Sequence, residues 1–146
     1  MNLAENRKAR FEYEVMDDFE AGIELLGFEA KAIRAGKANV TNAFVIVRGG
    51  EAYVIGMNID PYQVKNTPKD YEPDANRKLL LSKQEIAEIA EKTDGQGLTA
   101  IVLALYSKGP RVKAKIAIVR GKKTHDKRET IKKRDLDRSA NRGFDN

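Results

Sequence analysis

The sequence contains no cysteine, no tryptophan and a single histidine, His125. The absence of cysteine excludes disulfides, thiolate nucleophiles and Cys-ligated zinc sites. One histidine is a poor basis for a metal centre or a catalytic triad, so we expect neither a metal nor another cofactor. Only five Phe and five Tyr occur, so aliphatic side chains must fill most of the interior. With 41% hydrophobic residues in 146, the chain can build one modest core.

Signals for export, membrane insertion and catalysis are also missing. No N-terminal apolar run resembles a signal peptide, and no stretch approaches the ~18 apolar residues of a membrane span, so we expect a cytoplasmic protein. His125 lies in a charged segment that offers no shaped pocket to tune its pKa for acid–base catalysis. Gly49-Gly50 lacks the Lys-Ser/Thr pair of a phosphate-binding loop. We therefore predict no catalytic residue, no small-molecule substrate and no enzyme activity.

Positive charge is concentrated at one end of the chain. Residues 121–146 hold nine Lys plus Arg and five Asp plus Glu, a net of +4, while residues 1–120 hold 18 and 17, a net of +1. A near-neutral body with a basic tail favours a polyanionic partner, either RNA or an anionic membrane. A solvated tail that only aids solubility would have the same composition.

Hydrophobic periodicity predicts a mainly β protein. Alternation of apolar and polar residues predicts seven strands, at 11–15, 19–25, 44–47, 52–57, 77–81, 98–106 and 112–118. Asp17-Asp18 is expected to turn the first two into a hairpin, and Gly49-Gly50 the next two. Helices are expected at 28–34 and, after a capping box at Ser82 and Glu85, through about residue 92. Short antiparallel strands with a capped helix indicate a small antiparallel OB-like β-barrel with two or three short helices.

Three clusters of polar and cationic residues occur in the body and could converge on one RNA backbone. Alone, each cluster is more simply a set of solvated charges. The clusters are Asn6, Arg7, Lys8 and Arg10; Lys31 and Arg34; and Arg77 and Lys78. The tail segment 122–138 is a marginal helix that would gain order against a polyanion, and His125 could stack on a base.

Six blocks of the chain together resemble the SsrA-binding protein family. In order, they are 6–10 (NRKAR) with Tyr13, 19–23 (FEAGI), 27–34 (GFEAKAIR), 36–39 (GKAN), 77–81 (RKLLL) and 121–128 (GKKTHDKR). The family usually has His and an additional Arg just before 77–78, where this chain has Tyr71 and Ala75. Each block is weak alone, but six in order with matching spacing are specific.

The resemblance implies a bacterial RNA-binding factor of trans-translation. Its barrel, residues 1–120, would bind the tRNA-like domain of transfer-messenger RNA, through residues matching Asn6, Tyr13, Glu20 and Leu80. Its tail, residues 121–146, would be disordered when free and become helical in the empty mRNA channel of a stalled ribosome. The residues that match the tail motif for the decoding centre of the small subunit are Lys122, Lys123, His125, Asp126, Lys127 and Arg128.

Three rival interpretations remain open. An OB-like RNA-binding protein of another kind would bind RNA without needing a stalled ribosome. A membrane-surface protein would use the basic tail, but that tail lacks large apolar residues on any helical face. An enzyme would need a site that the sequence does not offer.

Overall fold

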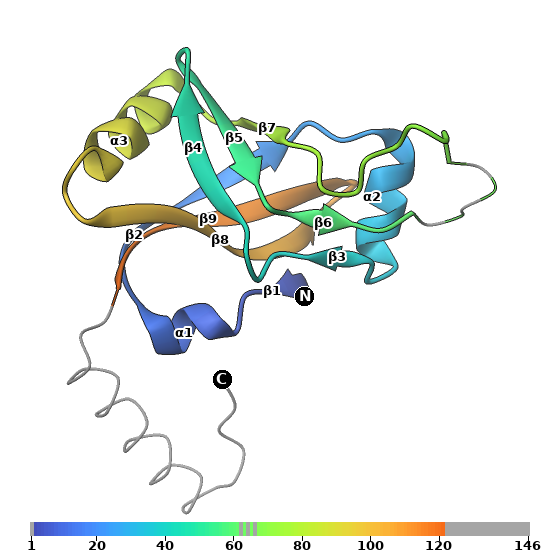
Figure 1. Ribbon diagram of the computed structural model, residues 1–146, viewed down its shortest axis with the longest axis horizontal. Coiled ribbons are helices and arrows are strands. Elements are labelled where there is room, and N and C mark those ends of the chain that lie inside the picture. Colours follow the sequence, from blue (N-terminus) through green and yellow to red (C-terminus); the bar gives the residue numbers. More distant parts are fainter. Residues whose placement is uncertain (1, 62, 64, 66, 122–146) are drawn as a thin grey trace, which may run out of the picture.

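The computed structural model describes residues 2–61, 63, 65 and 67–121, which form nine strands and three helices (Figure 1). The strands are β1 (Asn2–Glu5), β2 (Tyr13–Ile23), β3 (Ala38–Asn39), β4 (Phe44–Arg48), β5 (Glu51–Ile55), β6 (Asn58–Ile59), β7 (Arg77–Leu80), β8 (Leu98–Lys108) and β9 (Arg111–Gly121). The helices are α1 (Lys8–Glu12), α2 (Gly27–Arg34) and α3 (Lys83–Thr93). The tail predicted at 122–146 lies outside the described residues.

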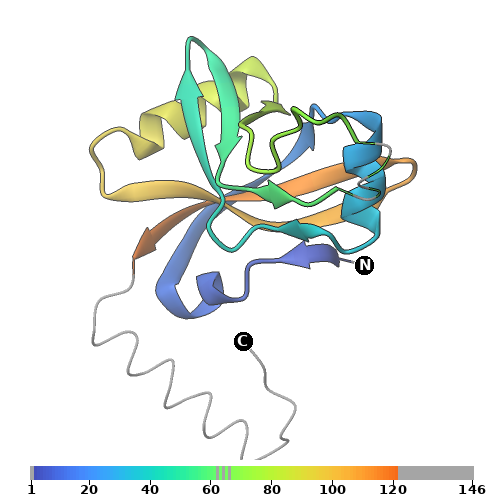
Figure 2. The ribbon, with the colours of Figure 1, turned by 45° about the vertical axis from the view of Figure 1, so that its right-hand side comes forward.

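The strands close into an antiparallel barrel, as the sequence predicted. The main sheet has the order β1-β8-β4-β5-β7-β2-β9, and β8 also pairs with β9. The pairing of β8 with β9 closes a ring of six strands. The seventh strand, β1, pairs with residues 104–106 of β8. Figure 2 shows the strands wrapping around a common interior. Closure leaves few exposed strand edges, which reduces edge-to-edge association.

The predicted hairpin at residues 11–25 is wrong. Residues 13–23 form one continuous strand, β2, which pairs with β9 from Tyr13 opposite Gly121 to Gly22 opposite Lys113. The register shifts between Val15 and Asp17, so the irregularity is a β-bulge rather than a chain reversal. Long pairing with β9 satisfies the backbone of this segment, and this outweighs the local turn preference of two aspartates.

The other hairpin and the capped helices are confirmed. Gly49 and Gly50 have φ of 61° and 77°, the conformation that a two-residue hairpin loop requires. Helix α3 begins at a capping box in which the Ser82 hydroxyl accepts from the Glu85 amide and the Glu85 carboxylate accepts from the Ser82 amide. Both longer helices pack into the barrel core, α2 through Ala32 and Ile33 and α3 through Ile86 and Ile89 (Figure 1).

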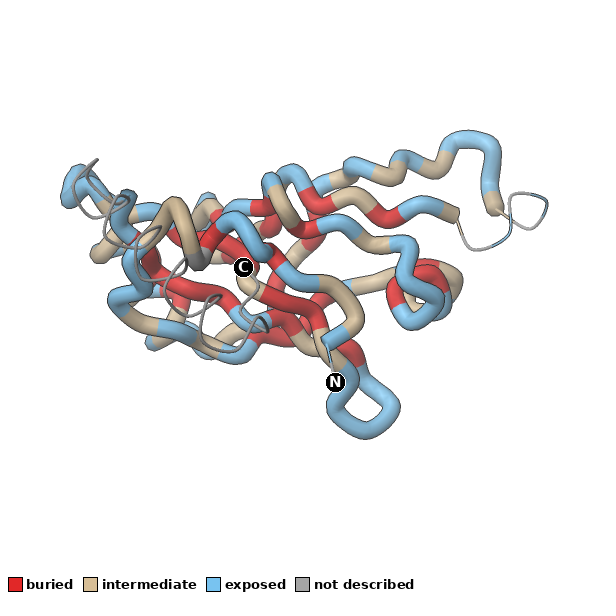
Figure 3. Tube along the Cα trace, turned by 90° about the horizontal axis from the view of Figure 1, so that it is seen from below, coloured by how far each residue is buried: buried red, intermediate tan, exposed pale blue. Residues whose placement is uncertain are grey.

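Two apolar clusters stabilise the fold. The main cluster fills the barrel and includes the alternating residues of β9, namely Val112, Ala114, Ile116 and Ile118. A second, unpredicted cluster lies where α1 packs on the barrel wall, with Ala9 against Ile101, Ala117 and Val119. The predicted cluster at 6–10 therefore lies partly in a helix that covers the wall. Figure 3 shows the buried positions along the strands, with exposed positions concentrated in connections. Among the described residues, no helix is long and apolar enough to span a membrane.

Candidate nucleic-acid interface

One row of cross-strand neighbours defines the outer barrel surface that we call the lysine face. Leu80 of β7 lies opposite Gly22 of β2, Gly22 opposite Lys113 of β9, and Lys113 opposite Tyr106 of β8. Directly opposite residues share a side of the sheet, and the alternate residues Ala21, Leu79 and Ala114 enter the core, so this row points outward. In the adjacent row, Glu20 lies opposite Lys115.

Gly22 leaves the position beside Leu80 without a side chain. A Cβ added there would lie 3.2 Å from the Leu80 Cβ, so any side chain would press on that leucine. Leu80 is 50% exposed. The row thus places one exposed apolar side chain near two lysines, a combination that suits a ribose or base beside its phosphate.

Glu20 is held in place by two partners from β8. The Tyr106 hydroxyl donates to Glu20 Oε2 at 2.5 Å, and Lys108 Nζ donates to Oε1 at 2.9 Å. The hydrogen bond from Tyr106, and then that from Lys108, lower the pKa of the Glu20 carboxyl. Burial and the hydrogen bond to Glu20 raise the pKa of Tyr106 to about 12. Glu20 is therefore a fixed anion that can still accept hydrogen bonds from base or ribose donors through its remaining lone pairs.

A second feature gathers Asn6, Lys8 and Tyr13 around a polar hollow of about 370 Å³ between α1 and the start of β4. Asn6 itself is 8% exposed. Its Nδ2 donates to the Val102 carbonyl at 3.3 Å, and its Oδ1 accepts from the Ala9 amide at 3.3 Å. These contacts anchor the start of α1 to β8 and engage both ends of the Asn6 side-chain amide.

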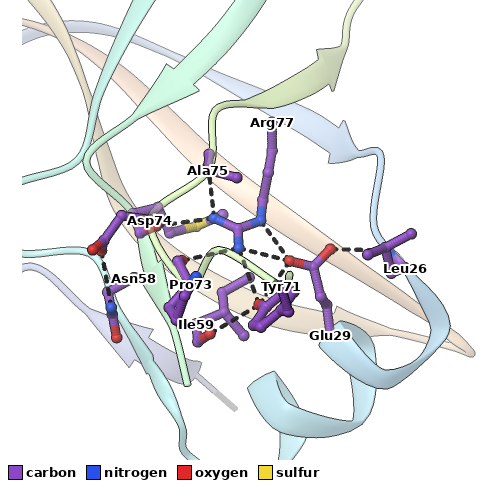
Figure 4. A network of polar contacts seen from close by, with 10 residues as sticks. Leu26, Glu29, Asn58, Ile59, Tyr71, Pro73, Asp74, Ala75 and Arg77 are labelled. Atoms are coloured by element: carbon purple, nitrogen blue, oxygen red, sulfur yellow. Dashed lines mark hydrogen bonds and ion pairs between the residues drawn. The ribbon is translucent and has the colours of Figure 1, made fainter. Parts of the chain in front are cut away.

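Arg77, which the sequence predicted as one of the RNA-binding residues, is buried in the structure. It is 5% exposed. Its Nε donates to Glu29 Oε2 at 2.8 Å, and its Nη2 lies 2.6 Å from the same oxygen (Figure 4). The remaining guanidinium donors bind the carbonyls of Met57, Pro73 and Ala75 and the Tyr71 hydroxyl. With its donors engaged and its side chain buried, Arg77 has no group to offer an RNA backbone.

Tyr71, one of the two departures from the family pattern, belongs to the same network. Its hydroxyl donates toward Glu29 Oε2 at 2.9 Å and also lies 2.9 Å from the Ile59 carbonyl (Figure 4). Burial, and then the hydrogen bond to Glu29, raise the pKa of Tyr71 to about 12. Ala75 contributes its backbone carbonyl to Arg77. Both residues thus serve to fix the loop before β7.

The other predicted body residues are not brought into the lysine face by any described contact. Lys31 is exposed on α2, and Arg34 of the same helix donates to the Pro110 carbonyl at the β8–β9 turn. Lys78 pairs with Glu51 at 3.2 Å, and the hydrogen bond and charge of Glu51 raise its pKa. Arg7 is exposed, while the side chain of Arg10 and the tail residues Lys122, Lys123, His125, Asp126, Lys127 and Arg128 lie outside the described part.

Sequence reasoning did not select Lys113, Lys115, Tyr106 and Lys108, which the structure places on the lysine face or in contact with Glu20. The signal was present, because β9 alternates apolar residues with Arg111, Lys113 and Lys115. What it lacked was the register that places this basic side beside Glu20 and Leu80. Within 2–61, 63, 65 and 67–121, no group of three or more His, Cys, Asp or Glu residues is arranged to hold a metal ion.

Comparison with known proteins gives one consistent result. The model of the family described as SmpB protein matches residues 3–146. The SsrA-binding protein of Mesoplasma florum is 47% identical over 142 residues, 97% of this chain and 95% of the relative. That of Thermosynechococcus vestitus is 45% identical over 142 residues, 97% of this chain and 93% of the relative.

A solved structure extends the similarity to three dimensions. It is described as "tmRNA-SmpB: a journey to the center of the bacterial ribosome", and its matching chain is 39% identical with a TM-score of 0.69. The match covers 82% of this chain and 84% of that one. The sequence matches span nearly the whole chain and the structural match spans most of it, and the chain belongs to the SmpB, or SsrA-binding, protein family.

Proposed function

We propose that this chain binds the tRNA-like domain of transfer-messenger RNA and delivers that RNA to stalled ribosomes for trans-translation. Family membership and the likeness to a chain described with tmRNA and the ribosome support the proposal. We further propose that the protein acts in the cytoplasm as a binding factor and not as an enzyme. The observation that carries the proposal is the lysine face, where Leu80, Glu20, Lys113 and Lys115 lie in adjacent outward rows.

Each group on the lysine face has a distinct part in RNA binding. Lys113 and Lys115 neutralise backbone phosphates and supply affinity that depends on salt. Leu80 packs on an unstacked base or ribose, for which Gly22 leaves room. The Glu20 carboxylate repels phosphate and accepts from base or 2′-hydroxyl donors. An anion fixed between lysines therefore favours a folded RNA with a particular donor at one position over an arbitrary backbone.

Variants of the lysines test this role. Replacing Lys113 and Lys115 together by Gln is expected to weaken binding of the tRNA-like domain and to lower the salt slope of log K by roughly 1 per lysine. Lys83→Gln, an exposed lysine on α3, is the matched control and should change neither quantity. Binding is measured by fluorescence anisotropy at several salt concentrations. A double variant with unchanged affinity and slope would exclude the lysine face as the RNA site.

We propose a division of work between residues 1–120 and the tail 121–146. The support is the charge partition, a net of +1 in the body and +4 in the tail. The body holds transfer-messenger RNA, and the tail enters the vacant mRNA channel, becomes helical there and places His125 in the decoding centre. Deleting 121–146 should leave RNA affinity within about tenfold, near 1.4 kcal/mol, while abolishing peptide tagging on ribosomes. A larger loss of RNA affinity would contradict the division.

A further inference from the structure

A hollow of about 420 Å³ lies beside α2, between that helix and the loop that precedes β7. Phe28 and Tyr71 line it with their rings in edge-to-face contact, the centroids 4.9 Å apart at 77°. Leu26, which is 54% exposed, lines it as well, together with Pro68. This combination of an apolar lining and a large exposed aliphatic residue is typical of an interaction site.

The hollow is held in one shape by the buried network described above. Glu29 comes from α2, Arg77 from the start of β7 and Tyr71 from the loop, and their mutual hydrogen bonds join the two walls (Figure 4). The Leu26 amide donates to Glu29 Oε1 at 2.9 Å, which ties the end of α2 to the same network. A site fixed in this way loses little conformational entropy when a partner binds.

The charge around the hollow is unlike that of the lysine face. The exposed residues Glu24, Asp70 and Glu72 line it, and within the described residues none of the three forms an ion pair. On β2, by contrast, Glu20 pairs with Lys108 and Asp18 lies 3.9 Å from Lys115. The carboxylates of the lysine face thus lie beside lysines, whereas the three exposed carboxylates of the hollow have no ion-pair partner among the described residues.

The two cations that line the hollow do not balance its four carboxylates. Arg77 pairs with Glu29, and Lys78 pairs with Glu51 and also interacts with Glu24. The lining therefore keeps an excess of negative charge, which repels an RNA backbone and attracts a cationic partner. The apolar lining in addition favours a partner that carries an apolar side chain, because only such a side chain removes Leu26 and Phe28 from water together.

We propose that this hollow is a docking site for a Lys/Arg-rich segment of a partner protein, with one apolar side chain inserted over Phe28 and Tyr71. Its excess of negative charge disfavours an RNA backbone, so it would give the protein a second, protein-directed contact. The inference does not depend on the RNA partner proposed above, since it rests on shape and charge alone.

The test uses the full chain, labelled with ¹⁵N, and a short synthetic peptide with a central Leu flanked by Arg and Lys. The peptide is expected to shift the amide signals of residues 24–29 and 70–78 in a saturable way. Asp70→Asn with Glu72→Gln should weaken binding about five- to tenfold, because both variants remove charge and keep size. Glu91→Gln, an exposed glutamate on α3, is the matched control and should leave the affinity unchanged.

Three results would overturn the proposal. One is the absence of saturable shifts. Another is equal binding to the neutralised variant. The third is competition by spermidine at equal charge concentration, which would reduce the site to unspecific attraction of cations. The lysine-face test uses Lys113 and Lys115, so its failure would not affect this outcome.

Discussion

Replacing Arg77 by Met tests how much the buried network of Arg77, Glu29 and Tyr71 contributes to the stability of the fold. The substitution leaves the Glu29 carboxylate, 4% exposed, without its cation. Removing one partner of a buried ion pair costs about 3–5 kcal/mol. The same change removes the donors to three backbone carbonyls, those of Met57, Pro73 and Ala75, so we expect a loss near the upper end. For a domain whose total stability is about 5–15 kcal/mol, this is a large fraction.

Urea unfolding followed by circular dichroism measures the loss, and an unchanged m-value would show that the unfolded surface is the same. Adding Glu29→Gln to Arg77→Met should recover part of the stability, since it removes the stranded charge and keeps an acceptor for the Leu26 amide. Lys92→Met is the control: it breaks the 2.8 Å pair with Asp17 on the surface, where solvent screening makes the loss small. A loss below about 1 kcal/mol for Arg77→Met would refute the reasoning.

Three further outcomes are expected. Gly56→Ala should destabilise by more than about 1 kcal/mol, because φ is +77° and the added Cβ would lie 2.7 Å from the Asn42 carbonyl oxygen. Gly95 also has a positive φ, +69°, but no atom lies within 4 Å of a Cβ added there. Gly95→Ala therefore has only the conformational cost and should unfold at a higher urea concentration than Gly56→Ala. Equal urea midpoints for the two variants would contradict the clash at Gly56. The pKa of Tyr71 is about 12, above the ordinary 10.0, so its contribution to stability is complete below pH 10 and is lost as the pH rises toward 12. As the pH rises, the urea midpoint should fall less in Tyr71→Phe than in the parent protein. An equal fall in the two proteins would contradict the raised pKa of Tyr71. His125→Ala should reduce tagging on ribosomes more than RNA affinity, and an unchanged tagging rate would exclude a stacking role.

The parts of the fold that follow from local sequence were predictable. The alternation in β9 identified four core positions, the Ser82 and Glu85 pair located the start of α3, and Gly49-Gly50 located the hairpin. The β2 strand was not predictable in this way. Two aspartates have a local preference for a turn, and only pairing with β9, about a hundred residues along the chain, overrides it.

The site was predictable residue by residue only in part. Glu20 and Leu80 follow from the family resemblance, and the structure places them in adjacent outward rows of the lysine face. The burial of Arg77 was not predicted, because a cation at the start of a strand is usually solvated. Its burial depends on Glu29, which is 48 positions away in the sequence. Lys113 and Lys115 were visible as the basic side of β9, but their closeness to Glu20 comes from strand register, which a single sequence does not specify.

The most direct test of the central claim is binding of the full chain to the tRNA-like domain of transfer-messenger RNA, with bulk tRNA as competitor, at two salt concentrations. If the lysine face recognises a folded RNA through Glu20 and Leu80 as well as through charge, binding should be tight, should resist excess tRNA and should keep much of its strength at the higher salt. Weak binding that yields to tRNA and collapses with salt would leave only counterion release, and would identify the chain as a general RNA-binding protein.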